Sequence, residues 1–251
     1  MSDTIRKQVI AGNWKMYKTS AEAVSFVEAI LPLIHPSERL VYLAVPFTAI
    51  ASAAKEARDS IRIGAQNMHD ASDGAFTGEI AAQMILEAGG RFVLLGHSER
   101  RKKFGEDDAF INRKVKRALH DQLQAILCVG ETMQERQAGH TEQVLMQQLE
   151  AGLRDVTAEQ LSSMLIAYEP VWAIGTGEAA APEQAEEAHL ICRNILTKHW
   201  GAEAADKVSI LYGGSVTVEN AAILLAEPNI DGLLVGRASL EPEIFAKIVN
   251  A

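Results

Sequence analysis

The sequence has few of the features that mark secreted, membrane-bound or metal-dependent proteins. Its 251 residues include only two cysteines. Both Cys128 and Cys192 lie in apolar patterns, so we expect reduced core thiols in a cytoplasmic protein and no disulfide framework. No run of about eighteen apolar residues, the length of a membrane-spanning helix, occurs. The first ten residues carry charges but no apolar core, so we expect no secretory signal.

Basic residues are also scarce relative to acidic ones. Lysine and arginine number 24 against 33 aspartates and glutamates, a formal net charge of -9. This balance argues against nucleic acid or an anionic membrane as the main partner. The seven histidines are scattered. No group of Cys, His and acidic residues has metal-ligand spacing, so we expect no bound metal.

The chain instead alternates short apolar runs with amphipathic segments. The runs are apolar at nearly every position, as in parallel strands that are buried on both faces. Eight such units in about 250 residues predict an α/β protein of the (β/α)8 barrel type, with residues 1–251 as one domain. The expected strands are residues 7–14, 40–45, 61–66, 92–95, 124–129, 164–168, 208–212 and 232–235, and the main expected helices are 20–34, 48–57, 79–88, 107–120, 132–153, 182–199, 217–226 and 242–249.

A doubly wound open sheet is the rival fold. Its first strand-to-helix turn would carry a glycine fingerprint for a dinucleotide. Here that turn reads Asn13-Trp14-Lys15-Met16 and has no such pattern. The barrel is therefore the favoured interpretation.

The sixth expected strand ends in an unusual segment. Glu169 precedes Pro170, which favours extended geometry at the end of the strand. Residues 171–174 are apolar, and Gly175-Thr176-Gly177 follows. An apolar loop between proline and glycine, next to one carboxylate, is typical of a lid over a reacting site. The plainer alternative is a buried turn beside a solvated Glu169.

Polar residues and glycines follow the expected strands, at the end where barrel enzymes hold their chemistry. A single polar residue after a strand is more typical of a capping or solvated group. Chance is a weaker explanation when the residues after so many strands lie at the same end of the barrel. The residues are Asn13, Lys15, Gln66, His97, Glu131, Glu169, Ser215 and Gly236.

Two glycine turns predict a phosphate site. Gly213-Gly214-Ser215 and Gly236-Arg237 each follow a strand and precede a helical segment. Backbone N–H groups at such turns bind anions, and barrels often hold phosphate after strands seven and eight. Gly175 could supply a third donor, and Lys15 a compensating charge. The alternative is that these glycines only form tight turns.

The remaining groups suit proton transfer. Glu169 has no paired carboxylate, which argues against glycoside hydrolysis. His97 begins a helical turn, where a neutral imidazole that donates to a carbonyl oxygen is expected. A carboxylate base with a hydrogen-bond donor and an ammonium group to stabilise an enediolate predicts an aldose–ketose isomerase. A closed lid would protect that intermediate from water.

Together these stretches resemble the triosephosphate isomerase family, along the whole chain and in the family's order. The resemblance implies a TIM barrel that interconverts dihydroxyacetone phosphate and D-glyceraldehyde 3-phosphate in glycolysis and gluconeogenesis, without cofactor or metal. The matching stretches are residues 11–16, 96–100, 128–131, 167–177, 211–216 and 232–240.

The resemblance also implies residue roles. Glu169 would be the base and His97 the electrophile, while Lys15 and Asn13 bind substrate and stabilise the anionic intermediate. Backbone groups at Gly175, Ser215, Gly236 and Arg237 would hold the phosphate.

A homodimer is implied as well. Residues 66–79 match the family's interface loop, and Thr77 would reach the partner's site to brace Asn13 and Lys15 there. Glu79 and Arg100 are expected at the same interface. A loop of about a dozen residues favours such a functional role over a plain excursion.

Three positions depart from the common family pattern. Arg237 replaces a second glycine, Glu178 replaces a lysine at the end of the lid, and Tyr17 replaces an asparagine near the interface. None of them removes a catalytic group. Two other functions stay open: an aldolase forming a Schiff base at Lys15, and a non-catalytic paralogue that binds a sugar phosphate or a protein.

Overall fold

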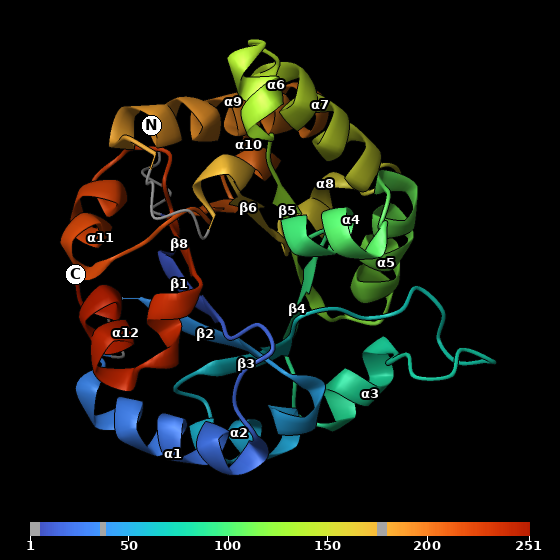
Figure 1. The fold of residues 1–251 in the computed structure, drawn as a ribbon. Helices are drawn as coiled ribbons and strands as arrows, with labels where there is room; N and C mark the ends of the chain where they lie inside the picture. Colours follow the sequence, from blue (N-terminus) through green and yellow to red (C-terminus); the bar gives the residue numbers. More distant parts are fainter. Residues whose placement is uncertain (1–5, 36–38, 175–179) are drawn as a thin grey trace.

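The computed structural model describes residues 6–35, 39–174 and 180–251. In these ranges eight parallel strands close into a barrel in chain order, each bonded to its sequence neighbours and β8 to β1. The (β/α)8 barrel predicted from the sequence is therefore confirmed (Figure 1). The strands are β1 Val9–Asn13, β2 Leu40–Val45, β3 Arg62–Ala65, β4 Phe92–Leu95, β5 Gln124–Val129, β6 Leu165–Tyr168, β7 Ser209–Tyr212 and β8 Gly232–Val235.

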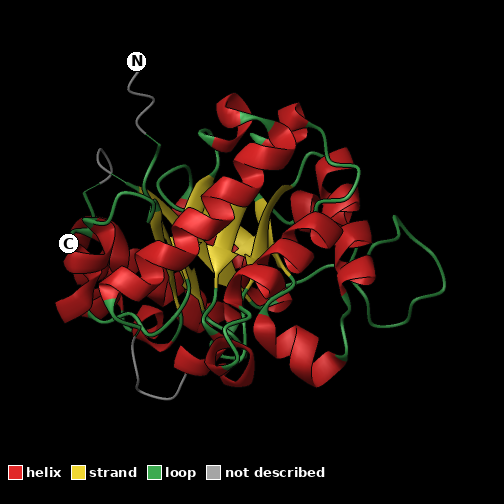
Figure 2. Cartoon of the chain, turned by 90° about the horizontal axis from the view of Figure 1, so that it is seen from above, coloured by secondary structure: helices red, strands yellow, loops and turns green. Residues whose placement is uncertain are grey.

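Helices surround the strands (Figure 2). No helix of the described residues is long and apolar enough to cross a membrane. The helices are α1 Ser20–Ile30, α2 Ile50–Ala57, α3 Ala82–Glu87, α4 Ser98–Phe104, α5 Asp108–His120, α6 Met133–Gln137, α7 Thr141–Gly152, α8 Ala158–Leu161, α9 Pro182–Trp200, α10 Ala202–Ala205, α11 Val218–Leu225 and α12 Pro242–Val249, with 3-10 turns η1 Leu31–Leu33, η2 Phe47–Ala49, η3 Val171–Ala173 and η4 Arg237–Leu240.

The core has two layers, as strands buried on both faces require. A large cluster joins the outer faces of the strands to the helices. A smaller cluster fills the barrel with alternate residues of the strands. Its buried members are Val9, Ala11, Tyr42, Ala44, Phe92, Leu94, Ile126, Cys128, Leu165, Ala167, Leu211 and Leu234.

Proline and glycine explain two of the differences from the expected helices. The first ends at Ile30 and not at residue 34, because Pro32 has no N–H to continue the helical pattern and lies in η1 instead. The helix expected at 132–153 is divided into α6 and α7. Gly139 has φ of +73°, a left-handed conformation that ends the first helix and that few other residues adopt.

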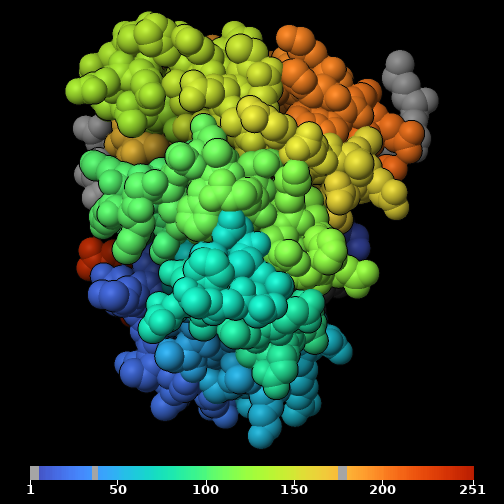
Figure 3. All heavy atoms as spheres, turned by 90° about the vertical axis from the view of Figure 1, so that its right-hand side faces the viewer, coloured from blue at the N-terminus to red at the C-terminus, as the bar shows by residue number. Residues whose placement is uncertain are grey.

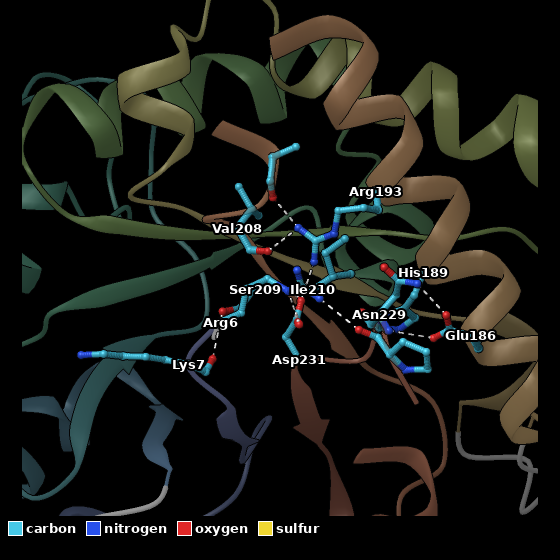
Figure 4. A network of polar contacts seen from close by, with 12 residues as sticks. Arg6, Lys7, Glu186, His189, Arg193, Val208, Ser209, Ile210, Asn229 and Asp231 are labelled. Atoms are coloured by element: carbon cyan, nitrogen blue, oxygen red, sulfur yellow. Dashed lines mark hydrogen bonds and ion pairs between the residues drawn. The ribbon is translucent and has the colours of Figure 1, made fainter. Parts of the chain in front are cut away.

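A polar network fixes α9 to the amino ends of β7 and β8 (Figure 4). Arg193 of α9 donates to the carbonyls of Ala205 and Val208. Its Nη2 lies 2.5 Å from Oδ2 of Asp231, the residue before β8. The other oxygen of Asp231 accepts from Nε of Arg6 at 2.5 Å. This network occupies the end of the barrel opposite the expected chemistry.

The segment between β3 and α3 projects from the barrel (Figures 1 and 2). Figure 3 views the molecule from that side. The helix expected from residue 79 begins only at Ala82, so the projecting segment is slightly longer than predicted. Inside it, the rings of His69 and Phe76 pack with centroids 4.2 Å apart.

Candidate active site

Glu169 is directed into the barrel mouth by strand alternation. Leu165 and Ala167 of β6 face the barrel interior, so the residue two positions further continues the same row. Its N–H donates to the carbonyl of Val129 at 2.7 Å, which holds it against β5. Glu169 is only 2% exposed. The alternative of a solvated carboxylate is therefore wrong.

His97 follows β4, two strands before β6, and faces this carboxylate. Its Nε2 lies 3.0 Å from Oε1 of Glu169. The imidazole also caps α4, because its Nδ1 accepts the N–H of Glu99 at 3.2 Å. An accepting Nδ1 places the hydrogen of a neutral ring on Nε2, facing Glu169. The second carboxylate oxygen accepts the N–H of Ser98 at 3.0 Å.

The electrostatic environment of His97 is mixed. Burial of the imidazole opposes its charged form, but the charge of Glu169 and its hydrogen bond outweigh burial, so the pKa of His97 is raised above its ordinary value. The nearby ammonium of Lys15 acts in the opposite direction. The carboxylate, more than the helix terminus, therefore decides the direction of the shift in this arrangement.

Asn13 is the last residue of β1, and Lys15 follows it at the same end of the barrel. Lys15 has φ of +52°, and its N–H donates to Oδ1 of Asn13 at 3.0 Å, which supports this conformation. Nε2 of Gln66 donates to the Lys15 carbonyl at 2.8 Å. The ammonium Nζ lies 3.0 Å from Oε1 of Glu99. The Lys15 side chain is therefore directed toward α4 and His97.

Glu99 is a site residue that sequence reasoning did not select. Its carboxylate contacts Lys15, and its Oε2 lies 3.8 Å from Nδ1 of His97. Burial opposes ionisation, but the hydrogen bond and charge of Lys15 outweigh it and lower the pKa of Glu99. The available signal was its position two residues after His97 in a helical first turn. Lys15, Glu99, His97 and Glu169 thus form one continuous polar chain.

The two expected phosphate turns flank this polar chain. A Cβ placed on Gly236 would lie 3.9 Å from Cε of Lys15, and one on Gly213 would lie 2.9 Å from Cγ of Glu169. Ser215 is half-buried after β7, and its carbonyl accepts from Asn220 at 3.0 Å. The structure therefore brings these turns together with the proton-transfer groups. Gly175 lies outside the described residues.

Glu131 follows β5 but takes part in a different cluster. It is completely buried, and its Oε1 accepts from the hydroxyl of Tyr168, Nε1 of Trp172 and Nη1 of Arg136 at 3.0–3.2 Å. Tyr168 belongs to the outer core layer, so this carboxylate lies on the helix side of the barrel. Glu131 holds the turn η3 that follows Glu169 and Pro170 and does not join the polar chain.

The expected interface residues lie on the projecting side. Thr77 and Glu79 are exposed in the segment that leaves the barrel. Arg100 is half-buried, and its Nε donates to Glu106 at 2.6 Å. The same carboxylate oxygen accepts from Lys114, whose Nζ also donates to Asn67 at the root of the projecting segment.

Comparison with known proteins agrees with this geometry. A family model described as triosephosphate isomerase matches residues 8–251. The chain belongs to the triosephosphate isomerase family. Triosephosphate isomerase of Protochlamydia amoebophila is 55% identical over 251 residues, which cover 100% of this chain and 95% of the relative. The enzyme of Carboxydothermus hydrogenoformans is 50% identical over 249 residues, which cover 98% of this chain and 99% of the relative. The enzyme of Solibacter usitatus is 48% identical over 248 residues, which cover 98% of this chain and 100% of the relative.

Two of the departures from the common family pattern, Arg237 and Tyr17, lie on the surface. Arg237 is exposed at the start of η4, and its φ is not positive, so a side chain fits there without strain. Tyr17 is 59% exposed next to Met16, which is 95% exposed. Glu178 lies outside the described residues.

Proposed function

We propose that Glu169 is the general base of this isomerase and that His97 is the electrophile that polarises the substrate's carbonyl. The reaction is that of the triosephosphate isomerase family, the interconversion of dihydroxyacetone phosphate and D-glyceraldehyde 3-phosphate in glycolysis and gluconeogenesis. One observation carries the assignment of roles: Nε2 of His97 lies 3.0 Å from the Glu169 carboxylate inside the barrel mouth.

The chemistry follows from these groups. Glu169 takes a proton from the carbon next to the carbonyl, and charge develops on the carbonyl oxygen. The Nε2 hydrogen of His97 and the ammonium of Lys15 stabilise that charge, and Asn13 supports the Lys15 backbone. Glu169 then returns the proton to the neighbouring carbon while the hydroxyl proton moves between the two oxygens. No group outside the protein and substrate is needed.

The carboxylate must first leave its present partners. Both of its oxygens accept hydrogen bonds, from Ser98 and from His97. A substrate placed between His97 and Glu169 separates the two side chains. The carboxylate then no longer raises the pKa of His97, while burial, the largest cause, still lowers it, with Lys15 adding to the lowering and Glu99 opposing it. The bound state therefore favours the neutral imidazole that a hydrogen-bond donor to a carbonyl requires.

We assign phosphate binding to backbone groups at Ser215, Gly236, Arg237 and Gly175, with Lys15 as the counter-charge. The position of Gly236 next to the Lys15 side chain supports this assignment. The ion pair of Lys15 with Glu99 suits a side chain that binds an anionic substrate through its charge, which favours the isomerase over a Schiff-base aldolase. Family membership favours it over a non-catalytic paralogue as well.

Inorganic phosphate as a competitive inhibitor tests this division of roles. In Lys15→Met we expect its inhibition constant to rise by at least ~10-fold, the effect of losing one charged contact. In Glu169→Gln we expect the dissociation constant of phosphate, measured by calorimetry, to stay within ~3-fold of the wild-type value, since the base does not hold phosphate. Equal weakening in both variants would contradict the division.

We also infer a cytoplasmic homodimer, with the whole chain as one domain. The segment from Gln66 to Glu79 projects from the barrel and exposes Phe76 by 47%. Met16 and Tyr17 expose further apolar surface. A second copy covering such surface would gain hydrophobic free energy. Thr77 would then brace the partner's site, with Glu79 and Arg100 at the same contact.

Deletion of the tip of this segment tests the dimer. We expect monomers by light scattering and much lower turnover, because each site would lose the brace from its partner. A shortened variant that stays dimeric would exclude this role for the segment.

A further inference from the structure

Arg101 of α4 lies across the carboxyl ends of β4 and β5. Its Nε donates to the carbonyl of Gly96 at 2.7 Å, and its Nη2 donates to the carbonyl of Cys128 at 3.3 Å. Its Nη1 lies 2.5 Å from Oδ1 of Asp108. A planar guanidinium with fixed donors can satisfy three acceptors in different directions at once. The side chain thus joins two neighbouring strands and the start of α5.

The two carbonyls belong to the segments that carry the reacting groups. Gly96 directly precedes His97, and Cys128 precedes Val129, whose carbonyl holds the N–H of Glu169 at 2.7 Å. The N–H of Arg101 also donates to the carbonyl of His97 at 3.1 Å. Arg101 is therefore attached on one side to the backbone of His97 and on the other to the strand that supports Glu169.

The close approach depends on the residue at position 96. Gly96 has φ of +73°, and a Cβ there would lie 3.1 Å from Nη2 of Arg101 and 3.2 Å from the Cys128 carbonyl. A residue without a side chain, in a left-handed conformation, is what lets the guanidinium fit between the strands.

We propose that Arg101 is a positioning residue of the isomerase reaction, which fixes His97 relative to Glu169 through the carbonyls of Gly96 and Cys128. The inference rests on the proposed roles of His97 and Glu169. Arg101 itself touches neither substrate nor the reacting atoms. A misplacement of a reacting group by about 1 Å can lower a rate by ~10²-fold, so loss of this brace would act on catalysis more than on binding.

The main test is Arg101→Lys. A lysine ammonium is a point charge and cannot reach both carbonyls and Asp108 together. We expect kcat to fall by ~10- to 100-fold, while KM and the inhibition constant of inorganic phosphate stay within ~3-fold, because the phosphate turns follow β7 and β8. A kcat within ~2-fold of wild type would overturn the proposal.

Two comparisons separate positioning from stability. Lys207→Gln removes the same charge from an exposed ion pair with Glu203 and is expected to leave kcat and thermal unfolding unchanged. Asp108→Asn removes the ion pair of Arg101 but keeps both carbonyl contacts. It is expected to lower the unfolding temperature and yet keep most of kcat. If Asp108→Asn lost as much kcat as Arg101→Lys, Arg101 would be a stabilising residue only.

Chemical rescue gives a second readout if the substitution disturbs folding. Arg101→Ala is assayed with millimolar guanidinium chloride and with equal sodium chloride. We expect guanidinium alone to restore part of kcat, and equal effects of both salts would count against the proposal. Glu169→Gln is measured in parallel. If that variant keeps full turnover, the assigned roles fail; if it is inactive while Arg101→Lys is fully active, only the positioning role fails.

Discussion

His189 should make the protein sensitive to mild acid. The side chain is completely buried in α9, where its Nδ1 lies 3.1 Å from the carbonyl of Asn229 (Figure 4). No hydrogen-bond partner for its Nε2 occurs in the part of the chain that the structure describes. Burial is the main cause that lowers the pKa of His189 to about 3, the Asn229 contact opposes it, and Arg193 adds to the lowering.

The sign and size of the effect follow from linkage. Between its unfolded pKa of about 6.5 and its folded pKa, His189 binds a proton in the unfolded state and not in the folded state. Its contribution to stability is therefore complete above about pH 6.5 and is lost as the pH falls toward about 3. Each pH unit in this window changes the free energy of unfolding by about 1.4 kcal/mol. Between about pH 7 and pH 5 the loss is about 2 kcal/mol.

Urea unfolding at a fixed protein concentration measures this loss. Wild type is compared with His189→Gln, which keeps a donor for Asn229 but cannot be protonated, and with His35→Gln at an exposed position. The quantity of interest is the change between the two pH values and not the absolute stability. We expect the change in His189→Gln to be about 2 kcal/mol smaller than in the other two proteins. A difference below about 0.5 kcal/mol would refute the buried neutral imidazole.

Further predictions concern the barrel. Asp231→Asn leaves the buried Arg193 without its counter-charge, so we expect the free energy of unfolding in urea to fall by about 3–5 kcal/mol. The control Arg6→Gln should lower it by about 1 kcal/mol or less. Equal losses in the two variants would contradict the network. Phe92→Ala should cost about 3–5 kcal/mol because Phe92 fills the barrel interior against Tyr42, with ring centroids 4.9 Å apart. Calorimetry showing an unchanged unfolding temperature would exclude that packing role.

Much of the barrel could be predicted because its signals are local. The strands β2, β4, β5 and β8 have the predicted bounds, since each is a short apolar run between turn signals. Strand alternation then brings Glu169 into the barrel mouth, and the carboxyl ends bring His97 beside it, with Lys15 joined to this pair through Glu99.

What could not be predicted depends on contacts between distant segments. Glu99 pairs with Lys15 across 84 residues, and Arg101 reaches the carbonyl of Cys128 across 27. The one local signal for Glu99 is its position two residues after His97, and no local pattern marks Arg101, which lies in an ordinary charged helix. Glu131 follows its strand as Glu169 does, but Tyr168, Trp172 and Arg136 hold it on the other side of the barrel wall.

Turnover of Glu169→Gln beside wild type tests the central claim most directly. The purified proteins isomerise D-glyceraldehyde 3-phosphate, and the ketone product is reduced in a coupled assay. We expect rapid turnover in wild type and a loss of ~10²- to 10⁴-fold in the variant, with its fold and its binding of inorganic phosphate retained. Turnover in the variant within ~2-fold of wild type would show that Glu169 is not the base.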